Sequence, residues 1–97
     1  MNLLADLHRL PIERSYEYAI ADMDEYGDIH NYDFADTYRE ALGCADFIDG
    51  NWMIELWVNF GNSEIGLSNR NYYEIVDGML QGEYPKHVEK HFEKTRK

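Results

Sequence analysis

The sequence is poor in cysteine and contains no long apolar run. Its single cysteine, Cys44, excludes an internal disulfide and any zinc site built from several cysteines. No stretch reaches the roughly 18 apolar residues of a membrane span, so we expect none. The N-terminal MNLLADLHRL carries Asp6 and Arg9 and lacks the pattern of a signal peptide. We therefore expect a cytoplasmic protein that does not contact membranes.

Basic residues are scarce in the middle of the chain. The 97 residues carry a net charge of -10. Residues 22–64 contain eleven acids and one base, Arg39, whereas residues 85–97 contain five bases and two acids. Such a charge distribution repels nucleic acid and anionic membranes, and it attracts cationic protein surfaces. A simpler interpretation remains open, in which the charge only keeps the protein soluble.

The apolar pattern predicts one α+β domain over residues 1–97, because 44% hydrophobic and 14% aromatic residues can form a core. Alternation predicts strands over 15–21, 28–32, 52–60 and 64–68. Helical spacing predicts helices over 2–9, 34–42, 70–80 and 86–96, the last within a basic C-terminal segment (85–97). The expected fold is an antiparallel sheet of about four strands with helices on one face, consistent with a ββα-ββα order.

Local signals place the expected ends of these elements. Asp33 is the expected N-cap of the helix over 34–42, and Gly43 is its expected end. Asp49-Gly50 and Gly61-Asn62 are the expected turns on either side of the central strand. The first half keeps an alternative, since residues 12–23 also match helical spacing after Pro11. Strand-turn-strand and helix-loop-helix therefore both remain open there.

The stretch DMDEYGDIHNYD, Asp22 to Asp33, has the length and glycine position of an EF-hand calcium loop. It departs from that pattern at Tyr26, where a short oxygen ligand is needed, and at Asp33, where a bidentate glutamate is usual. A β-hairpin turn is the favoured interpretation. His87 and His91 have the i,i+4 spacing of a zinc pair, but the zincin motif and two further ligands are missing. We therefore expect no metal and no cofactor.

The acidic span is the expected binding surface. On the predicted elements, Asp22 and Asp24 share one strand face about 7 Å apart. Asp33, Asp36 and Glu40 follow i, i+3, i+7 along a helix. Charges at this spacing are of the same order as phosphates along a nucleic-acid strand. Tyrosines nearby can stack on arginines. The expected partner-binding residues are Asp22, Asp24, Glu25, Tyr26, Asp28, Tyr32, Asp33, Asp36, Glu40, Asp46 and Asp49.

No nucleophile motif, phosphate loop or distinguished carboxylate pair occurs, so the sequence predicts a protein that is not an enzyme and has no catalytic residue. Its charge logic is shared with phage or plasmid counter-defence inhibitors that mimic nucleic acid. It is also shared with immunity proteins that neutralise nuclease toxins. We expect an inhibitor of a basic nucleic-acid-binding protein, with an immunity protein or a divalent-metal binder as alternatives. A homodimer along an exposed strand edge is also consistent with the sequence.

Overall fold

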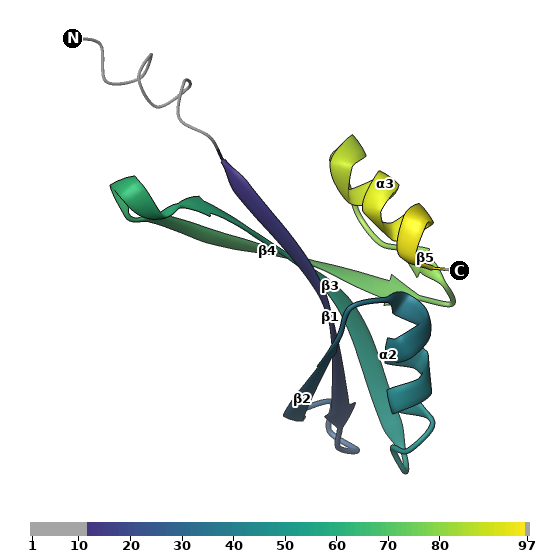
Figure 1. Cartoon of the computed structure of the whole chain (residues 1–97). Helices are drawn as coiled ribbons and strands as arrows, with labels where there is room; N and C mark the ends of the chain where they lie inside the picture. Colours follow the sequence, from purple (N-terminus) through teal and green to yellow (C-terminus); the bar gives the residue numbers. More distant parts are fainter. Residues whose placement is uncertain (1–11, 97) are drawn as a thin grey trace, which may run out of the picture.

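The segment WMIELWVNF forms the middle strand of a five-stranded antiparallel sheet in the computed structural model, which describes residues 12–96 (Figure 1). This strand, β3 (Asn51–Asn62), pairs with β1 (Glu13–Met23) on one side and β4 (Leu67–Val76) on the other. The outer strands are β2 (Ile29–Ala35) and the short β5 (Met79–Leu80), giving the order β2-β1-β3-β4-β5. The α+β prediction is confirmed, and the helical alternative for residues 12–23 is wrong.

The helices α2 (Tyr38–Ala45) and α3 (Lys86–Thr95) lie side by side on the same face of this sheet (Figure 1). Alternation directs Ile54, Leu56 and Val58 of β3 toward the helices, and all three are at most 1% exposed. Burial of such side chains is the main driving force for this packing. The core contains Tyr18, Ile20, Ala41, Ala45, Ile54, Leu56, Val58, Ile75, Val88 and Phe92. The helix predicted over 86–96 is confirmed, whereas the one over 2–9 lies outside the described residues.

The helix predicted over 34–42 begins four residues later, at Tyr38. β2 continues to Ala35, and the N-cap of α2 is Thr37, whose Oγ1 accepts the N–H of Glu40 at 3.1 Å. Asp33 is therefore a strand residue and not the cap. Thr37 and Glu40 have the spacing of a capping box, a stronger local start signal than an aspartate farther back. Gly43 lies inside α2, which ends at Ala45 with Asp46 as its C-cap.

The helix predicted over 70–80 is wrong, because this segment is a strand and a tight hairpin. β4 runs to Val76, and Asp77 and Gly78 form a two-residue turn into β5 with φ angles of 51° and 76°. Two positive φ values are what a type I′ hairpin turn needs, and Asp-Gly is a preferred sequence for it. The second half of the chain is thus strand-strand-strand-helix, not a second ββα unit.

The turn between β3 and β4 also differs from its prediction. Gly61 and Asn62 are the last residues of β3, and the connection is the 3₁₀ turn η1 (Ser63–Ile65) followed by Gly66 at φ 68°. The strand predicted over 64–68 therefore starts only at Leu67. Because the chain turns later than predicted, β3 extends to Asn62, and β4 is long because it continues to Val76.

Candidate functional site

Two acidic connections meet at one end of the sheet (Figure 1). Met23, the last residue of β1, pairs with Ile29 of β2 and with Asn51 of β3. The β1–β2 turn over 24–28 and the connection over 46–50 therefore flank the same strand end. We call this region the acidic end, and it comprises Asp22, Asp24, Glu25, Asp28, Asp46 and Asp49.

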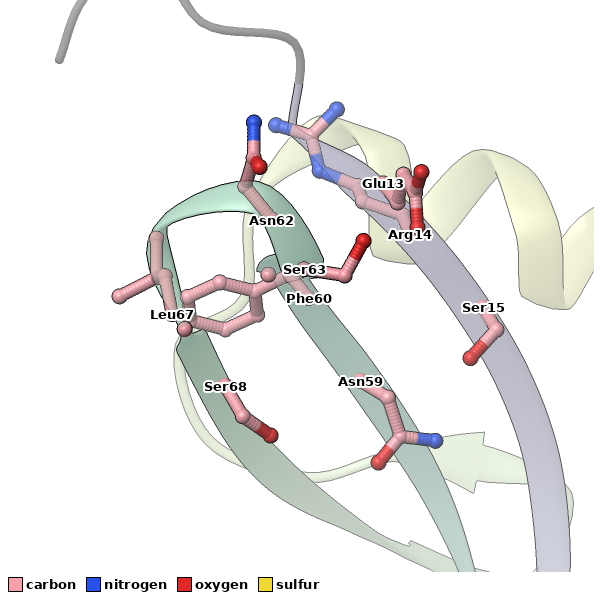
Figure 2. A pocket seen from close by; sticks show the side chains of 11 residues that line it. Glu13, Arg14, Ser15, Asn59, Phe60, Asn62, Ser63, Leu67 and Ser68 are labelled. Carbon is pink, nitrogen blue, oxygen red and sulfur yellow. The ribbon is translucent and has the colours of Figure 1, made fainter.

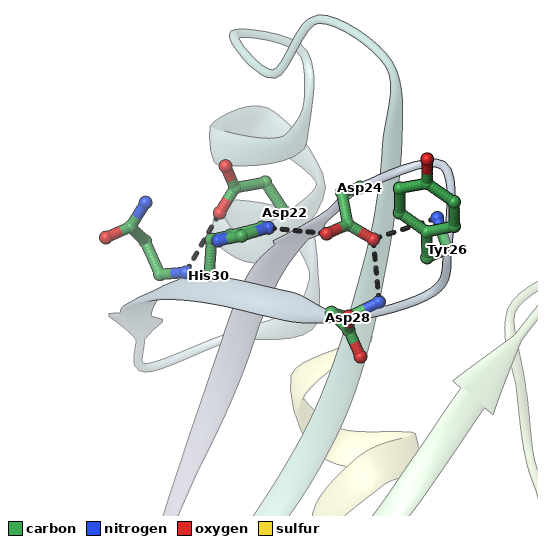
Figure 3. Close-up of polar contacts among 6 residues, drawn as sticks. Asp22, Asp24, Tyr26, Asp28 and His30 are labelled. Carbon is green, nitrogen blue, oxygen red and sulfur yellow. Dashed lines mark hydrogen bonds and ion pairs between the residues drawn. The ribbon is translucent and has the colours of Figure 1, made fainter.

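Hydrogen bonds to Asp24 hold the β1–β2 turn in shape (Figure 3). One carboxylate oxygen accepts the N–H groups of Tyr26 and Asp28, both at 2.9 Å, and the other lies 2.8 Å from His30 Nε2. The His30 contact and then the backbone N–H donors lower the pKa of Asp24. The hydrogen bond to Asp24 in turn raises the pKa of His30. Asp22 accepts a backbone N–H from β2 at 3.1 Å. The hairpin prediction is confirmed, and these two carboxylates organise it.

The two histidines of α3 pack against β1. His87 Nδ1 is 3.0 Å from the hydroxyl of Tyr16, and the His91 ring stacks on the Tyr16 ring with centroids 4.0 Å apart. Burial, followed by a nearby base in each case, lowers the pKa of both imidazoles. Within residues 12–96, no three histidine, cysteine, aspartate or glutamate side chains are grouped as metal ligands would be. The histidine pair therefore joins α3 to the sheet.

The remaining carboxylates of the acidic end are left without cationic partners. Glu25, Asp28, Asp46 and Asp49 are exposed, and none forms an ion pair with another described residue. Asp46 stands at the C-terminus of α2, whose last turn contains no base. The helix dipole places partial negative charge there, so Asp46 adds like charge to like. This arrangement costs folding free energy and concentrates negative potential at one end.

Four of the predicted partner-binding residues lie elsewhere. Asp33 is on β2, Asp36 is in the connection that follows, and Glu40 is in the first turn of α2. They do not form the predicted helical stripe, because the helix starts after the first two of them. Tyr32 points from β2 to the sheet face opposite the helices, while Tyr26 stays at the tip of the acidic end and is 82% exposed.

Aromatic rings cover the sheet face opposite α2 and α3, a surface that we call the open face. It comprises Glu17, Tyr32, Phe34, Glu55, Trp57, Arg70, Tyr72 and Glu74. The Trp57 ring is the centre, with centroids of Tyr32, Phe34 and Tyr72 at 5.1, 5.0 and 5.1 Å. Rings from β2 reach Trp57 across β1 because Ala19, only 1% exposed, lies between them.

Polar groups of the open face join these rings in one network. Trp57 Nε1 donates to Glu55 at 3.3 Å, and the Arg70 guanidinium carbon lies 4.8 Å from the Trp57 ring centroid. Arg70 also donates to Asn59, which donates to Glu17 at 3.4 Å. The sequence alone does not predict this surface. Alternation along β3 indicates that Trp57 and Glu55 lie opposite the core. No pattern in the sequence indicates their contacts with other strands.

A hollow lies at the other end of the sheet, between the start of β1 and the β3–β4 hairpin (Figure 2). Its ionisable lining groups are Glu13 and Arg14, and its other polar side chains are serines and asparagines. Arg14 and Glu13 come from β1, while Phe60 and Leu67 come from the hairpin, where the Phe60 ring lies beside Leu67. This end therefore lacks the charge excess of the acidic end.

Comparison with known protein families, curated proteins and solved structures gives no match for this chain. Among residues 12–96, neither helix has the length and apolarity to cross a membrane. A functional assignment therefore depends on the geometry and charge of the two surfaces just described.

Proposed function

We propose that this chain is a non-enzymatic inhibitor that binds a basic nucleic-acid-binding protein and occupies its nucleic-acid groove. The observation that supports the proposal is the acidic end, where two chain segments place six carboxylates around one strand terminus. A phage or mobile-element counter-defence inhibitor, such as an antirestriction or anti-CRISPR protein, fits this chemistry. The partner is protein, and nucleic acid itself is repelled.

The acidic end suits such a role because its shape is fixed before binding. The hydrogen bonds of Asp24 and Asp22 hold the turn, so little conformational entropy is lost when a partner binds. Its uncompensated charges steer a cationic partner and raise the association rate at low salt. Tyr26 at the tip can stack on an arginine at the rim of a groove.

A salt-dependent capture experiment tests this proposal. The full chain is immobilised, incubated with a nuclease-treated lysate of its own host, and washed at low salt. We expect a basic protein to be retained, to be released by a short DNA or RNA duplex, and to elute in about 0.5 M NaCl. Release by duplex shows that the two compete for one groove.

Matched charge variants separate the acidic end from net charge. The test variant carries Glu25→Gln, Asp28→Asn, Asp46→Asn and Asp49→Asn, none of which supplies a side-chain hydrogen bond to the turn. The control neutralises four other exposed acids, Glu13, Glu64, Glu83 and Glu89. We expect the test variant to lose the partner and the control to retain it. Retention by both variants, or no release by duplex, would contradict the proposal.

The identity of the captured protein distinguishes the immunity-protein alternative. A single nuclease toxin encoded beside this chain, bound in preference to other basic proteins, would identify an immunity protein that uses the same surface. A host restriction or CRISPR component would identify a counter-defence inhibitor.

A further inference from the structure

The open face carries exposed rings beside acidic groups that lack a cation. Phe34 and Tyr72 are 50% and 54% exposed, and Tyr32 is 41% exposed. Glu55 and Glu74 are directly opposite each other in the β3–β4 register. Neither forms an ion pair with another described residue. Like charges directly opposite on antiparallel strands destabilise a sheet, so this pair is costly in the free chain.

The charges of this face favour a cationic occupant. Arg70 is its one basic side chain among the described residues, and its contacts to Asn59 and the Trp57 ring already engage it. Through Asn59 it also lies next to Glu17. Glu55 and Glu74 are therefore left for an external cation. A second copy of this chain would bring three more carboxylates against one arginine to this face, and its whole net charge is -10, which opposes self-association through this face.

We infer that the open face binds an arginine-bearing segment of the basic partner, with a guanidinium lying over Tyr32 or Tyr72 and paired to Glu55 and Glu74. The inference rests on the proposed function for the partner's basic character. It adds a second contact surface that adjoins the acidic end through β2.

The chain itself contains a contact of the same kind, between Arg70 and Trp57. The Arg70 guanidinium lies over the face of Trp57 and is held by an amide oxygen, so this sheet already accommodates a planar cation on a ring. The Tyr72 ring is perpendicular to that of Trp57, at 85°, and its position on β4 leaves it half exposed. A flat, weakly hydrated guanidinium stacks on such rings better than a lysine ammonium does.

Titration of the isotope-labelled chain with short peptides tests the inference. One peptide is eight residues of alternating glycine and arginine, and its control replaces each arginine with lysine. We expect the arginine peptide to shift the Trp57 indole N–H and the amides of Tyr72 and Glu74 in NMR spectra. The lysine peptide should bind this face about two- to five-fold more weakly. Equal shifts with both peptides, or shifts confined to the acidic end, would overturn the inference.

Two double variants with the same charge change provide the specific control. Glu55→Gln with Glu74→Gln should weaken arginine-peptide binding about five-fold or more, with an unchanged or higher Tm because like-charge repulsion is removed. Glu83→Gln with Glu89→Gln should weaken it less than about two-fold. Equal weakening by the two double variants would attribute binding to net charge and overturn the inference. Concentration-dependent shifts of β4 without peptide would identify a second copy as the occupant and also overturn it.

The two proposals fail separately. The acidic-end variant with four substitutions should still show arginine-peptide shifts on the open face, because none of its changes lies there. If the parent chain captures no basic host protein but still shows the peptide shifts, only the proposal for the acidic end is refuted. Intact capture together with no peptide shifts on the open face would refute only the inference about that face.

Discussion

Substituting Gly61 by alanine should destabilise the protein through a backbone collision. A Cβ atom at Gly61 would lie 2.1 Å from the carbonyl oxygen of Leu67 and 3.2 Å from the Cα of Ser68. Ordinary carbon–oxygen contacts are about 3.3 Å or longer, so β4 must move by about 1 Å. Gly61 is not among the residues with positive φ, so the cost is steric and not conformational.

The magnitude follows from where the collision occurs. The Gly61–Ser68 pair is one step from the end of the β3–β4 ladder, where the strands can separate without opening the core. We therefore expect an overpacking cost of about 2 kcal/mol, within the usual range for added methyl groups. For a domain of this size, that lowers Tm by about 8–16 °C.

Gly43→Ala is the matched control, because it adds the same methyl group where nothing beyond its chain neighbours and its own helix backbone lies within 4 Å. Gly43 is inside α2, where alanine is favoured over glycine by about 0.5–1 kcal/mol, so this variant should be more stable than the parent. Urea denaturation followed by circular dichroism measures both variants. If Gly61→Ala unfolds within about 0.5 kcal/mol of the parent, the packing argument is refuted.

Two further predictions concern charge and protonation. Asp46→Asn should raise the free energy of unfolding by about 0.5 kcal/mol, because it removes a negative charge from the C-terminus of α2; in 0.5 M NaCl the gain in urea titrations should shrink, and an unchanged gain would argue against electrostatics. Burial, with Lys94 second, lowers the pKa of His91 from its ordinary value of 6.5, so the neutral ring favours folding and stability falls as the pH drops below that value. His91→Phe keeps a ring against Tyr16 and removes a buried nitrogen that has no hydrogen-bond partner among the described residues. Its Tm should therefore fall less than that of the parent between about pH 7.5 and 5.5, and equal losses would exclude His91 as the cause.

The parts of the fold that sequence predicted are those with strong local periodicity. Alternation from Trp52 to Phe60 was sufficient to identify the central strand and its buried face. The two main errors arose where helical spacing competed with local signals that indicated the true structure. Thr37 marked the true start of α2, and Asp77-Gly78 marked a hairpin in a segment whose apolar residues also fitted a helix. In the first place a helix-capping residue, and in the second a turn sequence, determined the structure, and the apolar periodicity did not.

The sequence predicts an acidic surface, but it does not predict which carboxylates lie together at the acidic end. The sequence identified the acidic span, yet only the strand pairing brings Asp46 and Asp49 to the turn that contains Asp24. It also removes Asp33 from this group, because β2 carries it away from the turn. The open face was harder still, since its central contact joins Phe34 to Trp57 across an intervening strand. Contacts of that kind depend on register, which a single sequence does not specify locally.

The two smallest side chains beneath the rings of the open face set how this surface tolerates change. Ala19 and Ala21 are at most 1% exposed and lie in register with Phe34 and Tyr32. A larger residue at either position would lift the rings away from the sheet and change the shape of the whole surface. In a saturation-mutagenesis selection for partner binding, these alanines would therefore rank among the most constrained positions without touching the partner. The rings above them would tolerate substitution by other aromatic residues. The strictest selection would therefore act on two alanines, which have no functional group of their own.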